Sequence, residues 1–473
     1  MQHAEIGLIG LGVMGANLAL NIAEKGHRIA VWNRTSEKTT QFADTAGPLR
    51  ERIIACETLK ELTAAIRPPR PIILMVPAGA AVDEQIAALR PLLAAEDIII
   101  DAGNANFRDT MRRFQEIEGS GLTFIGMGVS GGEDGARHGP SIMVGGSDEA
   151  WRRVEKILVS IAARYKDQPC VARLGNNGAG HFVKTIHNGI EYADMQMIAE
   201  VYGIMRDGLG LSTDEMANRF EAWNAGKLES YLIEITAKVL AARDPDKKVP
   251  VVDLILDRAG QKGTGRWSVI EAQKMGVPAT AIEAAVAARS LSAMKAEREA
   301  AEQAYGAVDR SIPAAEAEAL LADLEAALLA GKIAAYAQGF AVMQAASGEF
   351  YWNLPMPTIA RIWRAGCIIR SQFLDTIAEA FEESKPANLL LAPRFVELMQ
   401  ETNPALRRVV ATASRAGIAV PALSSALAYF DAYRQGRGTA NLIQGQRDFF
   451  GAHGFERIDM PGAHHGAWAQ SRG

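Results

Sequence analysis

Short apolar runs recur along the N-terminal part of the chain, and an amphipathic or polar stretch separates each run from the next. Runs of this kind, alternating with helical stretches, are typical of buried strands joined by helices. The sequence therefore predicts a parallel sheet covered by helices over residues 1–178, and ligands of such sheets bind at the carboxyl ends of the strands. The predicted strands are Ile6–Gly10, Arg28–Trp32, Ile72–Val76, Ile98–Asp101 and Phe124–Ile125.

After about Gly178 long helical stretches replace the short runs, alanine is abundant and strand-like alternation is scarce. This pattern predicts a large all-α domain over residues 179–435. From about Gly436 a glycine-punctuated, aromatic tail, residues 436–473, is too polar and broken to form its own core, so we expect it to pack on another surface, such as a partner subunit. The predicted helices are 179–208, 213–223, 227–242, 249–258, 278–300, 314–345, 357–364, 370–382, 386–394 and 403–435.

Composition limits the classes of function. The 473 residues, 48% hydrophobic and 22% charged, allow two or three domains with sizeable cores. The net charge of −5 provides no positive field for nucleic acid or an anionic membrane, so an anionic substrate needs local cations. Three cysteines without metal-like spacing argue against a zinc site and fit a reducing compartment. The uncharged segment Ile6–Ala23 holds four glycines and lacks a basic flank, so we expect a cytoplasmic protein without a signal or membrane segment.

A glycine pattern follows the first predicted strand and opens a helix: Gly10-Leu11-Gly12-Val13-Met14-Gly15. In this context the glycines permit a tight turn and the close approach of a pyrophosphate, and the helix amino terminus offers free N–H groups. We therefore expect an α/β Rossmann-like dinucleotide-binding domain, followed by the large all-α domain and the C-terminal tail. A plain glycine turn is the alternative.

The end of the second predicted strand selects between cofactors. NAD sites usually carry an acidic residue there, whereas this chain has Asn33-Arg34-Thr35, with Lys38 about one helical turn later. A guanidinium and a hydroxyl hold a 2′-phosphate that a carboxylate would repel, so the sequence predicts NADP. A solvated surface arginine is the alternative interpretation of Arg34.

Two further loops follow the third and fourth predicted strands and are expected to line the same crevice. They are Val76-Pro77-Ala78-Gly79 and Asp101-Ala-Gly-Asn104. Asn104 has donors and an acceptor suited to nicotinamide or substrate, although an asparagine that caps a turn would look the same.

A polar stripe crosses an otherwise apolar predicted helix. Lys184, His187, Asn188 and Glu191 follow i, i+3, i+4, i+7 spacing and therefore share one face. A lysine in a dry pocket has a lowered pKa and can take the proton of a hydroxyl as hydride leaves. An acid seven residues further along the same face, such as Glu191, can then protonate an enol carbon. Periodicity alone leaves two alternatives open, a structural salt-bridge network and a solvated face.

Other polar residues fit an anionic, hydroxyl-rich substrate. Ser130, Gly131 and Gly132 follow the last predicted strand, and their N–H groups suit a carboxylate or hydroxyls. Singly, each of the further cations is more easily explained as an ordinary salt-bridge partner, but together they supply the positive charge that the substrate needs. These residues are Lys262, Arg289, Arg447 and His453.

These motifs together resemble the 6-phosphogluconate dehydrogenase (decarboxylating) family in its long, two-domain form. The resemblance runs from about Ile6 to about Arg457. Its most specific stretches are Gly126–Arg137, Gly178–Met197, Trp363–Ser371 and Ile443–His453.

The resemblance implies oxidative decarboxylation of 6-phosphogluconate to ribulose 5-phosphate with reduction of NADP, as in the oxidative pentose phosphate pathway, and no metal. It implies that Lys184 is the general base and Glu191 the general acid, and that a homodimer brings Arg447 and His453 to the partner's active site. The substrate-binding residues that it implies are Asn104, Ser130, Gly131, Gly132, His187, Asn188, Tyr192, Lys262, Arg289, Arg447 and His453.

Three departures from the family pattern concern fine tuning rather than the reaction. Pro77 stands where a lysine is common, Arg266 replaces the lysine of Gly-Thr-Gly-Lys-Trp, and Ala102 replaces a glycine. Two other functions compete with this one. A simpler β-hydroxyacid dehydrogenase of the hydroxyisobutyrate type is much shorter and lacks the Lys262 loop and the Arg447/His453 tail. A non-catalytic NADP-binding sensor predicts loss of Lys184 or Glu191, and both are present.

Overall fold

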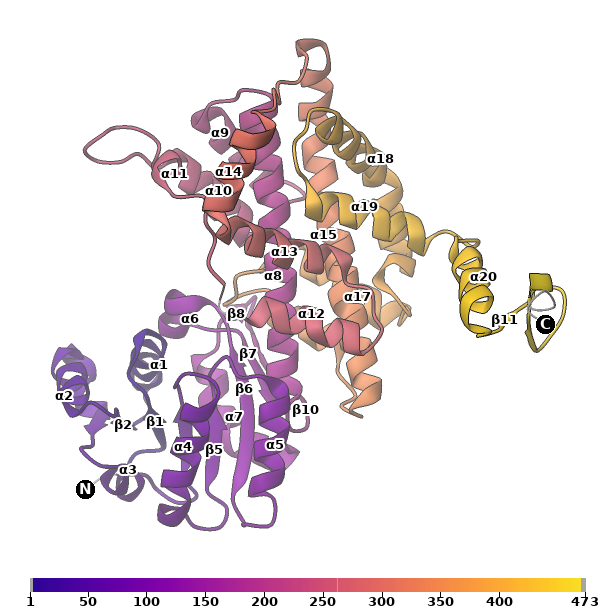
Figure 1. Ribbon diagram of the computed structural model, residues 1–473. Coiled ribbons are helices and arrows are strands. Elements are labelled where there is room, and N and C mark those ends of the chain that lie inside the picture. Colours follow the sequence, from indigo (N-terminus) through magenta and orange to yellow (C-terminus); the bar gives the residue numbers. More distant parts are fainter. Residues whose placement is uncertain (1–2, 262, 469–473) are drawn as a thin grey trace. The chain divides into compact units, whose positions relative to one another are not determined.

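The computed structural model describes residues 3–261 and 263–468. It divides into two compact units, Met1–Ala426 and Leu427–Gly473, and each is described by itself. Figure 1 shows the course of the chain, with a sheet and its helices in the N-terminal part and a helical array after it.

An eight-stranded sheet forms the centre of the N-terminal part, in the order β10-β7-β6-β5-β4-β1-β2-β3. All five predicted strands are present, and the sequence missed β3, β7 and β10. The strands are β1 (Ile6–Ile9), β2 (Ile29–Trp32), β3 (Ile53–Ala55), β4 (Pro71–Leu74), β5 (Ile98–Asp101), β6 (Thr123–Val129), β7 (Ile142–Gly145) and β10 (Val171–Gly175).

The five predicted strands pair parallel, as predicted, but the missed strand β7 runs antiparallel to β6, and β10 pairs parallel with β7. Only the seven-residue helix α6 (Gly132–His138) lies between β6 and β7. A helix of that length advances about 10 Å, whereas the seven residues of β6 span about 23 Å. The whole connection, residues 130–141, is about as short as crossovers between parallel strands become, and here the chain turns back as an antiparallel neighbour instead.

Side chains alternate between the two faces of the sheet, and each face has its own core. Ile6 and Leu8 pack with helices α1 and α7 on one face, while Ile9 packs with α3 and α4 on the other. Strands buried on both faces explain why these runs are continuously apolar. The covering helices are α1 (Val13–Glu24), α2 (Ser36–Thr45), α3 (Leu59–Ala65), α4 (Ala80–Leu89), α5 (Phe107–Ile117) and α7 (Asp148–Ile161).

The second part of the larger unit is helical, as predicted, although several boundaries differ. The predicted helix 278–300 breaks at Met294, and the predicted helix 403–435 breaks at Gly417, which has φ +67°. Helix α12 was not predicted. The elements are α8 (Ala179–Gly203) with its π-helical end (Ile204–Gly208), α9 (Thr213–Asn224), α10 (Tyr231–Ala241), α11 (Val251–Leu254), α12 (Thr264–Lys274), α13 (Thr280–Ala293), α14 (Lys295–Tyr305), α15 (Ala314–Glu349), α16 (Met356–Ile362), α17 (Phe373–Glu383), η4 (Leu389–Leu391), α18 (Pro393–Arg415) and α19 (Pro421–Tyr433).

Helix α15 passes through the middle of this array. Its 36 residues are long and apolar enough to cross a membrane by composition, yet 89% of its most apolar window is buried inside the protein. The apolar side chains of α15 thus already have protein partners. It packs against α8, where the Lys332 ammonium lies 2.7 Å from a carboxylate oxygen of Asp194, both side chains being buried.

The tail unit contains structure that the sequence did not predict, helix α20 (Ala440–Gly451) and the hairpin strands β11 (Phe455–Glu456) and β12 (Ala463–His464). Its centre is polar. The carboxylate of Asp448 accepts hydrogen bonds from the backbone N–H groups of Gly454 and Gly466 and from the side chains of His465 and Trp468, at 2.6–2.9 Å. A carboxylate with four donors thus organises this segment in place of an apolar core.

Candidate active site

Helix α8 lies directly against strand β6 because two glycines of that strand leave room for it. A Cβ on Gly128 would lie 2.5 Å from the Cβ of Lys184, and a Cβ on Gly126 would lie 3.0 Å from the His181 ring. Such distances are too short for any side chain. The alternating glycines of β6 therefore bring the polar stripe of α8 to the carboxyl end of the sheet, and they are a sequence signal that was missed.

The ammonium group of Lys184 is buried and makes hydrogen bonds only with neutral partners among those that the structure describes. Its Nζ donates to Asn188 Oδ1 at 2.7 Å and to Ser130 Oγ at 3.2 Å, and it lies 3.4 Å from His187 Nδ1. Burial lowers the pKa of Lys184 from its ordinary value. The predicted stripe is thus a buried face, and a solvated face is excluded.

His187 is held in the same cluster as a neutral ring. Burial is the largest cause that lowers the pKa of His187 well below the ordinary value, and the nearby charge of Lys184 is the next. Its Nε2 lies 3.4 Å from Ser130 Oγ, and the edge of its ring meets Trp363 with centroids 5.4 Å apart. A neutral imidazole offers one donor and one acceptor, which suits it to holding a hydroxyl-bearing ligand.

Glu191 lies one turn beyond His187, with its Oε2 3.8 Å from His187 Nδ1 and its side chain 20% exposed. Burial raises the pKa of Glu191, while Lys184 and Arg289 act in the opposite direction. Lys184 and Glu191 influence each other by charge, since each shifts the pKa of the other. A lowered lysine pKa beside a raised carboxyl pKa is the arrangement that a base and an acid need to exchange protons near neutral pH.

Tyr192 and Arg289 adjoin this cluster. The Arg289 guanidinium, from α13, lies over the Tyr192 ring at 3.5 Å from its centroid. A Cβ on Gly265 of α12 would also lie 2.6 Å from atoms of the ring. The unpredicted helix α12 therefore begins beside Tyr192, next to the segment that contains Lys262. Lys262 itself is outside the described residues.

The turn that follows β6 presents Ser130, Gly131 and Gly132 beside the stripe. Gly131 has φ +100°, and a Cβ there would lie 2.6 Å from the carbonyl oxygen of Gly366. Only glycine fits such a turn without strain. The segment after α16 belongs to the stretch Trp363–Ser371 that resembles the family, and it thus supports the turn that carries Ser130.

On the nucleotide side, the glycine pattern forms the tight turn that was predicted. Gly10 has φ +100°, and a Cβ on Gly15 would lie 1.9 Å from the Gly10 carbonyl oxygen. A Cβ on Gly12 would meet nothing within 4 Å, which leaves its backbone open to a ligand. Asn33 Oδ1 accepts a hydrogen bond from the Leu11 N–H at 3.0 Å, so Asn33 fixes the glycine turn to the end of β2.

A hollow of about 320 Å³ opens beside this turn. Arg34, Thr35 and Lys38 are exposed along it, and the carboxylate in its lining, Glu84, comes from α4 rather than from the end of β2. Arg34, Thr35 and Lys38 fit the phosphates of a dinucleotide. The other predicted nucleotide contacts of these two segments are not part of its lining, namely Leu11, Val13, Met14, Gly15 and Ala78. Asn104 is exposed on the loop after β5. The full lining is Ile9, Gly10, Gly12, Trp32, Asn33, Arg34, Thr35, Lys38, Met75, Val76, Pro77, Ala81, Glu84 and Gln85.

Arg447 and His453 belong to the tail unit. Arg447 Nη1 donates to Gln444 Oε1 at 2.9 Å, and the His453 ring meets Phe450 edge to face. Within residues 3–261 and 263–468 no group of three or more His, Cys, Asp or Glu side chains is arranged to hold a metal ion.

Comparisons with known proteins cover both parts of the chain. Residues 5–175 match the NAD binding domain of 6-phosphogluconate dehydrogenase, and residues 180–468 match the 6-phosphogluconate dehydrogenase C-terminal domain. A solved Plasmodium falciparum 6-phosphogluconate dehydrogenase superposes with a TM-score of 0.95 and 41% identity, over 98% of this chain and 100% of that one.

Curated relatives are similar along their whole length. A decarboxylating 6-phosphogluconate dehydrogenase of Salmonella typhimurium is 47% identical over 99% of this chain and 100% of its own. Two Bacillus subtilis relatives differ in cofactor. The NAD(+)-dependent enzyme is 46% identical over 98% of this chain and 99% of its own. The NADP(+)-dependent enzyme is 47% identical over 99% of this chain and 100% of its own. From the two domain matches and this full-length likeness, the chain belongs to the 6-phosphogluconate dehydrogenase family.

Proposed function

We propose that this protein oxidises and decarboxylates 6-phosphogluconate with NADP, giving ribulose 5-phosphate, carbon dioxide and NADPH. The observation that carries the proposal is the buried cluster of Lys184, Asn188, Ser130 and His187, one turn from Glu191. A sensor that only binds a nucleotide has no need of a lysine and a carboxyl group whose pKa values burial moves toward each other.

The first step is removal of the substrate's hydroxyl proton. Neutral Lys184 takes that proton, and Asn188 Oδ1 and Ser130 Oγ hold its Nζ in place. The nicotinamide of a bound cofactor supplies a hydride acceptor. His187, which is neutral, and Asn188 hold the substrate between base and acid.

Hydride leaves the carbon in the β position to the carboxylate, and the oxidised product is therefore a β-keto acid. Its carboxylate leaves as carbon dioxide, and the bonding electron pair remains as an enolate beside protonated Lys184, without requiring a metal. Glu191 then protonates the enol carbon. Lys184 has then gained the proton of the substrate hydroxyl, and Glu191 has lost one to the enol carbon. A proton passed from Lys184 to Glu191 restores both groups, so the reaction balances.

NADP is the finer part of this proposal, because relatives of similar identity differ in cofactor. Arg34, Thr35 and Lys38 support it, since they provide two cations and a hydroxyl where a 2′-phosphate would lie. Pro77 lines the same hollow, so the departure at this position bears on nucleotide affinity.

The phosphate end of the substrate is proposed to meet Arg289 and Lys262, with Tyr192 beneath the Arg289 guanidinium. Arg447 and His453 are proposed to come from the tail of the second subunit of a homodimer, with residues 1–178, 179–435 and 436–473 as the working regions of each subunit. A cytoplasmic location belongs to the same proposal and fits the buried α15.

The test is an assay of the purified protein with 6-phosphogluconate and either cofactor, following nicotinamide absorbance together with release of carbon dioxide. We expect equal amounts of NADPH and carbon dioxide, with a lower KM for NADP than for NAD. Reduction of cofactor without release of carbon dioxide would favour a simple β-hydroxyacid dehydrogenase. If neither NADPH nor carbon dioxide formed, the result would favour a protein that binds the nucleotide without catalysis.

A further inference from the structure

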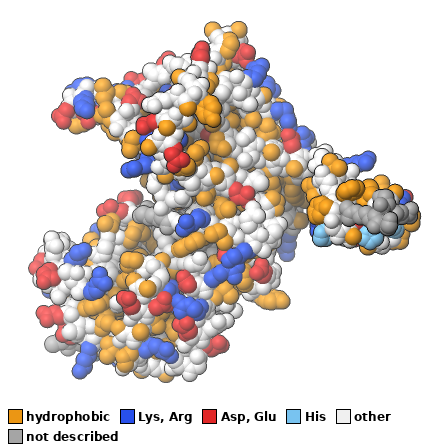
Figure 2. All heavy atoms as spheres, viewed as in Figure 1, with side chains coloured by type: hydrophobic (Ala, Val, Ile, Leu, Met, Phe, Trp, Pro, Cys, Tyr) orange, Lys and Arg blue, Asp and Glu red, His pale blue; other side chains and the backbone are white. Residues whose placement is uncertain are grey.

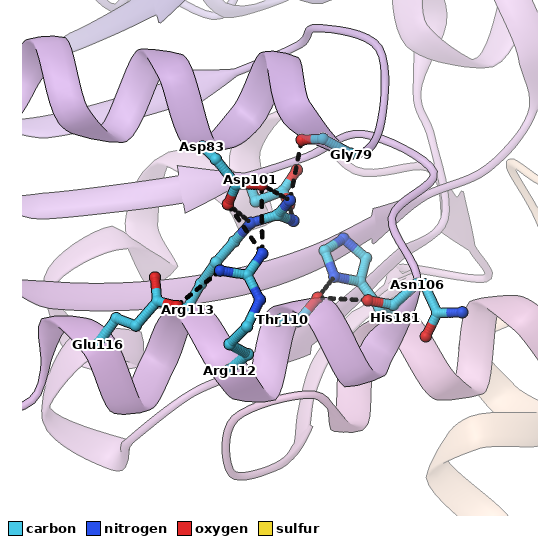
Figure 3. A network of polar contacts seen from close by, with 9 residues as sticks. All are labelled: Gly79, Asp83, Asp101, Asn106, Thr110, Arg112, Arg113, Glu116 and His181. Carbon is cyan, nitrogen blue, oxygen red and sulfur yellow. Dashed lines mark hydrogen bonds and ion pairs between the residues drawn. The ribbon is translucent and has the colours of Figure 1, made fainter.

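A buried arginine links the two loops that follow β4 and β5. Arg113 lies on α5, and its side chain is completely buried. In Figure 3 dashed lines join its guanidinium to Gly79, Asp83 and Asp101. Nothing in the proposed reaction uses Arg113, yet it lies behind both loops that are proposed to contact the cofactor.

The first set of contacts holds the loop between β4 and α4. Arg113 Nη2 donates to the Gly79 carbonyl oxygen at 3.0 Å, and Nε and Nη2 donate to the two carboxylate oxygens of Asp83 at 2.7 Å and 3.2 Å. The hydrogen bond from Arg113 lowers the pKa of Asp83, so this carboxylate is ionised at neutral pH. Gly79 ends the segment Val76–Gly79 and precedes α4, so the guanidinium fixes the point where this loop turns into its helix.

The second set holds the loop between β5 and α5. Arg113 Nη1 lies 3.3 Å from Asp101 Oδ2, and Asp101 Oδ1 in turn accepts the Gly103 N–H at 3.1 Å. Asn104, the proposed cofactor and substrate contact, is the next residue. The two loops also touch, because a Cβ on Gly103 would lie 3.0 Å from the Val76 carbonyl oxygen. A chain of hydrogen bonds thus runs from Gly79 through Arg113 and Asp101 to Gly103.

Stability of the fold alone does not explain why a buried arginine occupies this position. A buried ion pair usually contributes little net stability, because removing both charges from water offsets their attraction. What a guanidinium offers is a rigid planar fork of donors that can hold several acceptors at fixed positions. Arg112, the adjacent residue, also pairs with Asp83, but its side chain is 44% exposed and reaches neither Asp101 nor Gly79 in the contacts found for the described residues.

We propose that Arg113 is a positioning residue of this dehydrogenase, which holds the Val76–Gly79 and Asp101–Asn104 loops in one arrangement so that the cofactor meets its contacts already in place. The inference rests on the proposed function, because it takes these two loops to bind NADP. Without Arg113 the loops sample other arrangements, and binding must first order them, which weakens affinity.

The experiment compares Arg113→Lys with the matched neighbour Arg112→Lys in the full-length protein. NADP affinity is measured by titration, and KM and kcat for both substrates are measured beside thermal unfolding. A lysine in place of Arg113 keeps the charge but loses the fork, so we expect the Kd and KM for NADP to rise by about tenfold. We expect kcat to change by less than about twofold and Arg112→Lys to behave as the wild type, because its contacts are exposed.

A second variant guards against misfolding. Asp83→Asn removes the charge and one of the two oxygens that accept hydrogen bonds from the Arg113 guanidinium, at a position that is 39% exposed. We expect it to raise the Kd for NADP as Arg113→Lys does, by a smaller factor. A folded Arg113→Lys protein that binds NADP as tightly as the wild type overturns the inference, and so does an equal loss of affinity in Arg112→Lys.

The variant Asn104→Ala distinguishes failure of the inference about Arg113 from failure of the proposed function. Weaker NADP binding in Asn104→Ala, with unchanged binding in Arg113→Lys, would mean that the loop binds cofactor but does not depend on Arg113. Unchanged NADP affinity in Asn104→Ala would instead remove the loop from the proposed cofactor site, and the role of Arg113 would fall with it.

Discussion

Two buried lysines have their ammonium groups against residues of α8 or its surroundings, one from α15 and one from α8 itself, and their hydrogen-bond partners differ. Lys332 reaches in from α15 and pairs with both carboxylate oxygens of Asp194, at 2.7 Å and 2.8 Å. Lys184, on α8 itself, donates to the neutral oxygens of Asn188 and Ser130. The Lys332–Asp194 ion pair joins two helices, whereas burial lowers the pKa of Lys184, which has no carboxylate within hydrogen-bond distance among the described residues. The partner, not burial alone, therefore separates a structural lysine from a proposed base.

The sharpest way to test the contrast is Lys184→Met. We expect kcat to fall by about 10³- to 10⁴-fold, because the variant has no group to take the hydroxyl proton. The NADP affinity should stay near that of the wild type, since Lys184 does not line the nucleotide hollow. Steady-state kinetics and a binding titration measure the two quantities, and normal turnover would remove Lys184 as the base.

Lys332→Met should show the opposite pattern. It leaves the Asp194 carboxylate buried without its cation, so we expect the free energy of unfolding to fall by about 3–5 kcal/mol. Denaturant titration measures the loss, and the double variant Lys332→Met/Asp194→Leu should recover part of it. A Lys332→Met protein as stable as the wild type would show that the pair is dispensable.

Glu191→Gln tests the other end of the stripe. The amide keeps the shape of the side chain but cannot donate the proton to carbon, so we expect kcat to fall by about 10²-fold. Deuterium incorporation from heavy water into ribulose 5-phosphate should fall with it. The idea fails if the variant incorporates solvent deuterium at the rate of the wild type.

Arg34→Ala extends the comparison to an exposed cation, whose role depends on a ligand rather than on a protein partner. We expect the Kd for NADP to rise by about tenfold while the Kd for NAD is unchanged, because only NADP carries a 2′-phosphate. Parallel titrations with the two nucleotides provide the measurement and its control. Equal weakening of both would assign Arg34 to general binding.

The pH dependence of stability gives the smallest expected effect. Burial places the pKa of Lys184 in the folded protein below its value in the unfolded chain. Between these two pKa values the unfolded chain binds more protons, so stability rises with pH across that window. We therefore expect the stability of the wild type relative to Lys184→Met to increase as pH approaches 10.5, the ordinary lysine pKa. A difference that stays constant with pH would contradict the lowered pKa.

The sequence predicted the elements whose signal is local. The run Ile98–Asp101 coincides with β5, and the glycine pattern forms the predicted turn with Gly10 at positive φ. It missed β7, which pairs antiparallel with β6 after the short helix α6, and α12, which begins after a glycine loop. It also missed Arg113, because an arginine on a helix gives no sign in the sequence that it will be buried between two loops.

For the stripe, the sequence by itself determined that Lys184, His187, Asn188 and Glu191 share a face, because helical periodicity depends only on spacing along the chain. The tertiary structure decided that this face is buried and that Ser130, 54 residues earlier, meets the Lys184 ammonium. It also decided that Asp194 pairs with Lys332, 138 residues later. The reason is physical: which group keeps or loses its proton depends on neighbours in space and on the exclusion of water, and residues far apart in the sequence supply both.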